Sequence, residues 1–345
     1  MPYQSRAHYP LATVIILLLA GCVQLPTHRP PPAPAPVTPP NEAAARLDNA
    51  VRLQIFLDAN HFRPGMIDGR TGEFFRKALA RYNRAHDLPA SARPDVSNIN
   101  PYAIYTITDD DLKRVGTNAK ENAELAKQKS LPYNNLREVI AERFHTSRAF
   151  LAHLNPDRNI DALQAGASVR VPNVEEPFRI DQLPLVKGPP RDASLAKRKI
   201  HINVTTRMLE VLENDHLIAA FPITPGSSEH PAPIGDWQII GITTFPWFRW
   251  DAGVLNRGER TDEYYDLPPG PRNPVGILWM QLNRPGDGIH GCPNAETIGR
   301  TGSHGCIRLA NWDAAIIWRM VTTGTPVTIE SDEIKVAVGE SGRSL

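Results

Sequence analysis

Two identical tripeptides carry the side chains best suited to chemistry in this sequence. They are His290-Gly291-Cys292 and His304-Gly305-Cys306. Imidazole and thiol groups together suit a zinc site, a disulfide, or a nucleophilic thiol with a base beside it. The spacing and the neighbouring residues favour one of these three sites over the others.

A catalytic thiol uses most of these residues. A free thiol has a pKa near ~8.5, so little of it is ionised at pH 7 and a neighbouring base must activate it. A histidine provides that base and can later return the proton to a leaving amine. The glycines let backbone N–H groups turn towards a developing oxyanion, and Ser303 can add a hydrogen bond that orients its neighbours.

Zinc and a structural disulfide remain open at this point. Two His and two Cys can complete a tetrahedral zinc site, but structural zinc clusters usually space their cysteines as CxxC, unlike this segment. A disulfide between Cys292 and Cys306 is permitted in an oxidising compartment, yet it leaves both histidines without a role. Because a catalytic thiol accounts for more of these residues than either alternative, we predict that no metal and no organic cofactor is required.

The residues around Cys306 resemble a known family. His290-Gly291 followed by Ser303–Arg308 (SHGCIR) is similar to the signature of the L,D-transpeptidases of the YkuD/ErfK type. Two upstream segments, Pro231–Trp237 (PAPIGDW) and Gly270–Gly276 (GPRNPVG), resemble the family's TPxGxF and GPxNPxG motifs in the same order. The resemblance covers about Ile200–Glu330. It implies a mixed-β catalytic fold, peptidoglycan stem peptides as substrate and a covalent acyl-cysteine intermediate.

The resemblance also implies the catalytic roles. Cys306 is the nucleophile, and His290 is the general base, oriented through the backbone carbonyl of Gly291. The oxyanion hole is lined by His304, Gly305 and Cys306. The residues alone do not rank the two histidines, so His304 remains an alternative base.

Four other side chains are candidates for substrate binding. The resemblance implies that Ser303 and Arg308 support substrate, although a turn residue and a surface strand residue are the simpler interpretations. The run FPWFRWD contains Trp247 and Trp250, which either flank a peptide groove or pack in a core.

Position 292 departs from the family pattern, because it is Cys where the family commonly has Thr or Ser after His-Gly. It is either a small buried filler or a reversible partner of Cys306.

Apolar alternation predicts the element type that holds these residues. From Lys199 onward apolar and polar residues alternate, Gly and Pro recur at short spacing, and few helical stretches occur before Asn311–Val321. We expect a mostly-β catalytic domain, sandwich- or barrel-like, over residues 199–330, followed by a tail over 331–345.

The N-terminus predicts export and anchoring. The apolar run Leu11–Ala20 is too short to span a bilayer and suits a secretory signal over residues 1–21. Leu19–Cys22 resembles a bacterial lipobox with Cys22 as the lipidated residue. Residues 22–40 form a proline-rich tether. We expect a periplasmic protein anchored by lipid, at the inner face of the outer membrane because Val23 rather than Asp follows the cysteine.

Two small modules are predicted between the tether and the catalytic domain. Residues 41–95 contain a helix over Glu42–Asn60 and a second helix capped by Thr71, and they resemble a peptidoglycan-binding helical domain. After a connector over 96–130, residues 131–175 resemble a LysM module, a βααβ sugar-binding fold, with a first strand near Leu131–Tyr133 and a helix capped by Thr146. A linker over 176–198 follows.

Composition limits the remaining classes. The 345 residues include 38 Lys+Arg, 37 Asp+Glu, 33 Pro and three Cys, and the net charge of +1 excludes a strongly basic nucleic-acid binder. We therefore expect a multidomain α+β lipoprotein. As an L,D-transpeptidase it would transfer a stem-peptide acyl group to an amine of another stem or of an outer-membrane lipoprotein. The alternatives are an L,D-carboxypeptidase, with water as acceptor, and a non-catalytic wall-binding lipoprotein.

Overall fold

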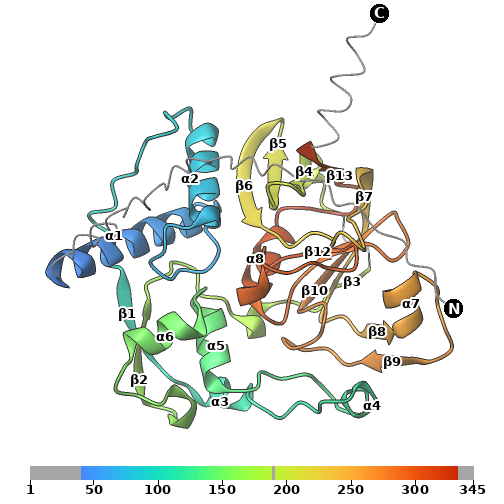
Figure 1. The fold of residues 1–345 in the computed structure, drawn as a ribbon, viewed down its shortest axis with the longest axis horizontal. Coiled ribbons are helices and arrows are strands. Elements are labelled where there is room, and N and C mark those ends of the chain that lie inside the picture. Colours follow the sequence, from blue (N-terminus) through green and yellow to red (C-terminus); the bar gives the residue numbers. More distant parts are fainter. Residues whose placement is uncertain (1–39, 189–190, 333–345) are drawn as a thin grey trace, which may run out of the picture. The chain divides into compact units, whose positions relative to one another are not determined.

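The structure is a computed structural model that describes residues 40–188 and 191–332 (Figure 1). The predicted signal peptide, Cys22 and the tether up to residue 39 lie outside the described residues, as does the tail over 333–345. From Pro40 onward the chain belongs to one compact unit. Within the described ranges, no helix combines the length and apolar character needed to cross a membrane.

Two helices open the described chain and confirm the predicted pair. They are α1 (Pro40–Ala59) and α2 (Glu73–Ala85). Part of their apolar surface packs with Met208 and Ala220 of the large sheet, while Val51, Ile55 and Ile67 pack in a second cluster with apolar residues between 107 and 174. The predicted cap is wrong, because Gly72 occupies the N-cap of α2 and no side chain caps that helix.

The second helix pair is confirmed, but its first strand was predicted in the wrong place. The helices α5 (Leu136–Arg143) and α6 (Arg148–Leu154) precede β2 (Ser168–Pro172). The antiparallel partner of β2 is β1 (Tyr102–Thr106), within the predicted connector. Residue Leu131 instead donates its N–H to the carbonyl of Pro269 at the catalytic domain. The assignment to LysM stays a prediction.

Short helices and caps complete this region. The helices α3 (Asp109–Lys113) and α4 (Asn122–Leu125) separate β1 from α5. Ser147 rather than Thr146 caps α6, because its hydroxyl accepts from the Phe150 N–H. The Thr146 hydroxyl donates instead to the carbonyl of Ile67, which ties the start of α6 to the first helical segment.

The catalytic region is built on one nine-stranded mixed sheet. Its order is β12-β11-β10-β7-β13-β4-β5-β6, with β3 also on β7. The strands β11–β12 and β13–β4 pair in parallel, and the others pair antiparallel. The members are β3 (Lys187–Gly188), β4 (Arg198–Asn203), β5 (Met208–Glu213), β6 (His216–Pro222), β7 (Gly235–Thr244), β10 (Leu278–Leu282), β11 (Gly288–His290), β12 (Ile307–Arg308) and β13 (Pro326–Glu330).

Three more elements belong to this region. A separate hairpin joins β8 (Phe248–Asp251) to β9 (Tyr264–Leu267), with the short helix α7 (Ala252–Arg257) between them. The helix α8 (Asn311–Ile317) follows β12. Single 3-10 turns occur at Ile160–Ala162, Ile180–Gln182, Ala193–Leu195 and Ala295–Thr297.

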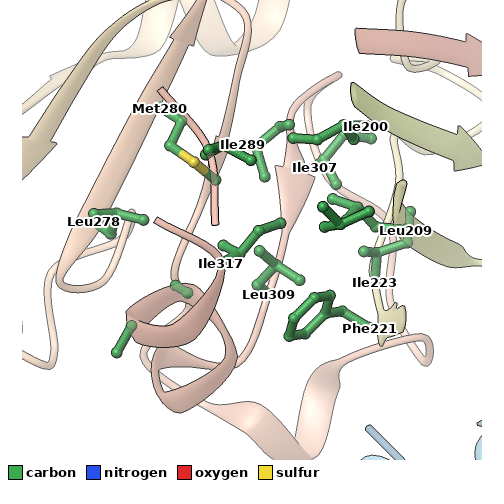
Figure 2. Close-up of a cluster of buried hydrophobic side chains, with 14 of the residues drawn as sticks. Ile200, Leu209, Phe221, Ile223, Leu278, Met280, Ile289, Ile307, Leu309 and Ile317 are labelled. Atoms are coloured by element: carbon green, nitrogen blue, oxygen red, sulfur yellow. The ribbon is translucent and has the colours of Figure 1, made fainter. Parts of the chain in front are cut away.

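The main core lies between the two halves of the curled sheet. Figure 2 shows side chains from β4, β5 and β6 meeting those from β10, β11 and α8. Alternating apolar residues such as Ile200 and Ile202 are fully buried, as the strand pattern predicts. The prediction of a mostly-β domain is confirmed, but a sandwich of two sheets is wrong, because a single sheet curls around this core.

Candidate active site

The parallel pair β11–β12 brings the two tripeptides together. Its register places Ile289 beside Ile307 and His290 beside Arg308. Since side chains alternate along a strand, the two isoleucines enter the core while His290 and Arg308 lie on the opposite face. Cys306 immediately precedes β12 and lies two residues before Arg308, so the same alternation places it on the face of His290.

The first histidine is held in a defined orientation. His290 is 4% exposed, and its ring stacks on Trp279 of β10 with 5.5 Å between the ring centroids. Its Nδ1 lies 2.6 Å from the carbonyl oxygen of Gly291. A carbonyl can only accept, so Nδ1 carries the proton and Nε2 has the free lone pair. The contact predicted between His290 and Gly291 is therefore present.

Electrostatics keep this imidazole neutral. Burial, helped by the positive charge of Arg308, lowers the pKa of His290 to about 4, against the hydrogen bond to the Gly291 carbonyl. At pH 7 the ring is uncharged and available to accept a proton. This is the state that a general base requires.

The thiol is also neutral at rest. Burial raises the pKa of Cys306 to about 11, with Asp287 adding to the rise and the Gly288 N–H and Arg308 opposing it. The Sγ atom lies 3.6 Å from the Gly286 carbonyl oxygen. A protonated thiol is a weak nucleophile, so the proton must leave as attack begins. A neutral acid and a neutral base therefore occupy one face of the sheet.

The loop before Cys306 is fixed from two sides. The Ser303 hydroxyl donates to the carbonyl of Cys306, and its backbone pairs with Pro225 and Ser227. Gly305 has φ +103°, in the region that favours glycine. Ser303 thus positions the loop, as its sequence context suggested, while its contact with substrate stays a prediction, as does the oxyanion hole.

The second histidine has a different environment. His304 is exposed, and its ring lies 4.9 Å from the ring of His230 between centroids. Partial burial lowers its pKa, and the positive fields of His230 and Arg308 add to the effect. No carbonyl or carboxylate orients this ring in the described part of the chain. The geometry therefore favours His290 over His304 as the base.

A cavity of about 620 Å³ includes Gly286 in its lining, the residue whose carbonyl oxygen lies 3.6 Å from Cys306 Sγ, while Cys306 and His290 are not lining residues. Trp247, 58% exposed, lines it together with Trp279, Asp287 and His304. The structure does not bring Trp250 into this lining, because its ring packs on Tyr265 in the β8–β9 hairpin. Arg308 also stays outside the lining, and its Nη1 donates to the Gly302 carbonyl.

Three residues of this region had no place in the sequence interpretation. Trp279 stacks on His290, Asp287 raises the thiol pKa, and His230 faces His304. Only Trp279 had a usable signal, since it alternates with buried Leu278 and Met280 and so had to lie on the opposite face. The other two lie in loops that the strand pattern does not place.

The Cys292 thiol is buried, with Sγ 3.4 Å from the Asn294 carbonyl and 3.6 Å from Thr297 Oγ1. Both Cys292 and Cys306 are free thiols. These contacts fit the interpretation of Cys292 as a buried filler. The hypothesis that it pairs reversibly with Cys306 stays a prediction.

The described residues contain no cluster of three or more His, Cys, Asp or Glu side chains arranged to hold a metal ion. Comparison with known proteins then supplies the family. Residues 197–329 match the YkuD family, described as the L,D-transpeptidase catalytic domain. These residues are an L,D-transpeptidase catalytic domain. The matched range contains both tripeptides and the strands from β4 to β13, except for Glu330 at the end of β13.

Two sequence relatives agree with this assignment. The transpeptidase is 29% identical over 192 residues to a Bacillus licheniformis protein named as an L,D-transpeptidase, YkuD, covering 56% of this chain and 92% of that protein. A second relative, named as an L,D-transpeptidase, YbiS, from Escherichia coli K12, is 34% identical over 36% of this chain and 42% of its own length. Superposition on the L,D-transpeptidase from Mycobacterium smegmatis gives a TM-score of 0.32 at 20% identity, covering 39% of this chain and 58% of that one.

Proposed function

We propose that the transpeptidase cleaves the bond between the third residue and the terminal D-alanine of a peptidoglycan stem tetrapeptide, with Cys306 as nucleophile. The observation that carries this proposal is the shared face of Cys306 and His290, with the His290 Nδ1 proton committed to the Gly291 carbonyl. That arrangement leaves Nε2 unprotonated and able to accept a proton, which supports its role as the base.

The neutral pair defines the first half of the reaction. Nε2 of His290 takes the thiol proton as Sγ bonds to the scissile carbonyl carbon, giving a tetrahedral intermediate. The imidazolium then returns this proton to the nitrogen of the leaving D-alanine, and the C–N bond breaks. The products are free D-alanine and an acyl-Cys306 thioester. The Gly291 carbonyl stabilises the transient imidazolium through Nδ1–H.

An acceptor amine completes the cycle. It loses a proton to neutral His290, attacks the thioester carbonyl and releases the Cys306 thiolate, which takes the proton back. An amine of a second stem gives a 3→3 cross-link, and a lysine of an outer-membrane lipoprotein gives an attached protein. Water in the same position gives carboxypeptidase activity.

The cavity suits a peptide that carries carboxylates. Its lining combines the indoles of Trp247 and Trp279 with Arg260, and also includes Arg249, whose Nη2 donates to the Thr261 carbonyl. Arginines bind carboxylates through paired N–H donors, and aromatic rings pack on the aliphatic parts of a peptide. A stem peptide offers both kinds of group.

The rest of the chain supports a location at the wall. Cys22 would anchor the protein to the inner face of the outer membrane, residues 22–40 would span the gap, and the two helical segments would bind wall glycan weakly. Tethering of this kind raises the local concentration of substrate without new catalytic contacts. Metabolic labelling with a fatty acid, lost in Cys22→Ala, tests the anchor.

Incubation of the purified protein with tetrapeptide muropeptides tests the reaction. We expect release of D-alanine, together with either a cross-linked dimer or a tripeptide, identified by mass spectrometry. The Cys306→Ala variant is the matched control and must yield neither. Absence of D-alanine release from the wild-type protein, with binding to wall polymer retained, would instead support a non-catalytic wall-binding lipoprotein.

A further inference from the structure

A buried amide lies directly behind the catalytic histidine. The side chain of Asn311, the first residue of α8, is fully buried, and its Oδ1 accepts from the Ile277 N–H at 3.2 Å. The same oxygen occupies the space that a Cβ would take at Gly276 or at Gly291. The amide thus packs against the peptide whose carbonyl orients His290.

A carboxylate from outside the catalytic domain holds this amide. Asn311 Nδ2 donates to Glu142 Oε1 at 2.9 Å, and Glu142 belongs to α5. The other oxygen of Glu142 accepts from the hydroxyl of Tyr133. Because Oδ1 of Asn311 faces a donor and Nδ2 faces acceptors, only one orientation of the amide satisfies its neighbours.

The burial of Glu142 means that loss of its hydrogen bond with Asn311 would be destabilising. The side chain is buried, which raises the pKa of Glu142 to about 7, against the hydrogen bonds from Tyr133 and Asn311. A buried acceptor that loses its partner leaves an unsatisfied polar group. The first helical segment also contacts the first turn of α8, since Arg63 Nε lies 3.5 Å from Asp313 Oδ1.

We propose that Glu142 is a positioning residue for catalysis, which acts through Asn311 and the Gly291 peptide to fix the orientation of His290. This inference rests on the proposed role of His290 and goes beyond it. The helical segment is then a structural part of the active site, in addition to any role in binding the wall. Displacement of a catalytic group by about 1 Å can lower a rate by about a hundredfold.

Three variants of the full chain distinguish a specific effect on the orientation of His290 from a general weakening of the interface between the helical segment and the catalytic domain. Glu142→Ala removes the acceptor. Glu142→Gln keeps an oxygen for Asn311 and lets its amide N–H donate to the Tyr133 oxygen. Arg148→Ala breaks another contact between the same two regions, the 2.8 Å pair with Glu296, without touching Asn311.

We expect kcat on a tetrapeptide to fall at least tenfold in Glu142→Ala with KM changed less than threefold, and to stay near wild type in Glu142→Gln and Arg148→Ala. Ring ¹⁵N spectra of histidine-labelled protein, with His290 assigned from His290→Ala, should show the Nδ1–H tautomer in wild type and a mixture in Glu142→Ala. This second readout does not need substrate, so it separates failure of this inference from failure of the proposed reaction.

Two results would overturn the inference. One is a folded Glu142→Ala protein with wild-type kcat and an unchanged His290 tautomer. The other is an equal loss of kcat in Arg148→Ala, which would indicate a loosened interface. Should Glu142→Ala not fold, Glu142→Asp decides, because it keeps the charge but withdraws it from Asn311. Wild-type kcat and tautomer in that variant contradict the inference, and a tenfold loss supports it.

Discussion

The two His-Gly-Cys tripeptides have the same sequence and opposite environments. In the first, His290 is buried and hydrogen-bonded to Gly291, and the buried Cys292 thiol contacts the Asn294 carbonyl. In the second, His304 is exposed at the cavity, and Cys306 lies on the same face as His290. In the proposed mechanism each tripeptide contributes one catalytic group, namely His290 from the first and Cys306 from the second.

The largest expected effect separates the two thiols. Cys306→Ala removes the atom that forms the acyl bond, so we expect D-alanine release to fall by more than about 10⁴-fold. Cys292→Ala should keep activity within about threefold, because its Sγ contacts only Asn294 and Thr297. Initial rates on the same tetrapeptide measure both. Loss of activity in both variants would contradict the assignment of Cys292 as a non-catalytic residue.

The histidines provide the next test. His290→Ala removes the oriented base, and we expect kcat to fall by about 10²–10⁴-fold. His304→Ala should cost less than about tenfold, since the exposed ring has no orienting partner in the described residues. Circular dichroism on both variants controls for folding. The opposite order of rates would make His304 the base.

The pH dependence sharpens the assignment of His290. Its lowered pKa of about 4 means that the neutral, accepting form increases as pH rises through 4 and is complete by pH 6. We expect acylation, measured as D-alanine release in a single turnover, to be about tenfold slower at pH 3 than on the plateau. A midpoint near 6.5 would instead indicate an exposed imidazole such as His304.

Alkylation of the thiol should follow a different curve. Iodoacetamide reacts with the thiolate, and the raised pKa of Cys306 (about 11) means that the thiolate fraction increases by about tenfold per pH unit from 7 to 9. Acylation by the peptide should be flat over that range, because His290 supplies the base. Mass spectrometry of the peptide containing Cys306 measures alkylation. A rate already independent of pH at 7 would indicate a resident thiolate.

The smallest effect concerns Cys292→Ser. The new hydroxyl meets the Asn294 carbonyl and Thr297 Oγ1, so we expect the free energy of unfolding to change by about 1 kcal/mol or less. Activity should respond to reductant as the wild type does. A response confined to the wild type would support a redox role for Cys292.

The sequence predicted the type of secondary structure and the family better than it predicted which residues meet in the folded protein. The alternation from Lys199 indicated strands, and the motif around Cys306 indicated the family, because both signals are local. The strand β1 was missed because its partner β2 lies far along the chain and Tyr102–Thr106 is only half-buried. Asp287 and His230 were missed for the same reason, since only tertiary structure brings their loops to the thiol.

The predicted modular layout shows a similar limit. Helix positions around Leu53 and Val139 follow from the spacing of apolar residues. That spacing does not say which partner the apolar face contacts. In the structure Glu142 and Arg63 contact α8 instead of solvent, and no local pattern distinguishes such a residue from a surface charge.

The place of β13 in the sheet has a consequence for synthesis. This last strand lies between β7 and β4, and it joins the β4–β5–β6 half to the half that carries His290 and Cys306. Until residue 330 has emerged, the two halves have no common strand and the core between them cannot close. Contacts so distant in sequence form slowly. A chain released before β13 would therefore contain every catalytic residue and still lack an assembled active site.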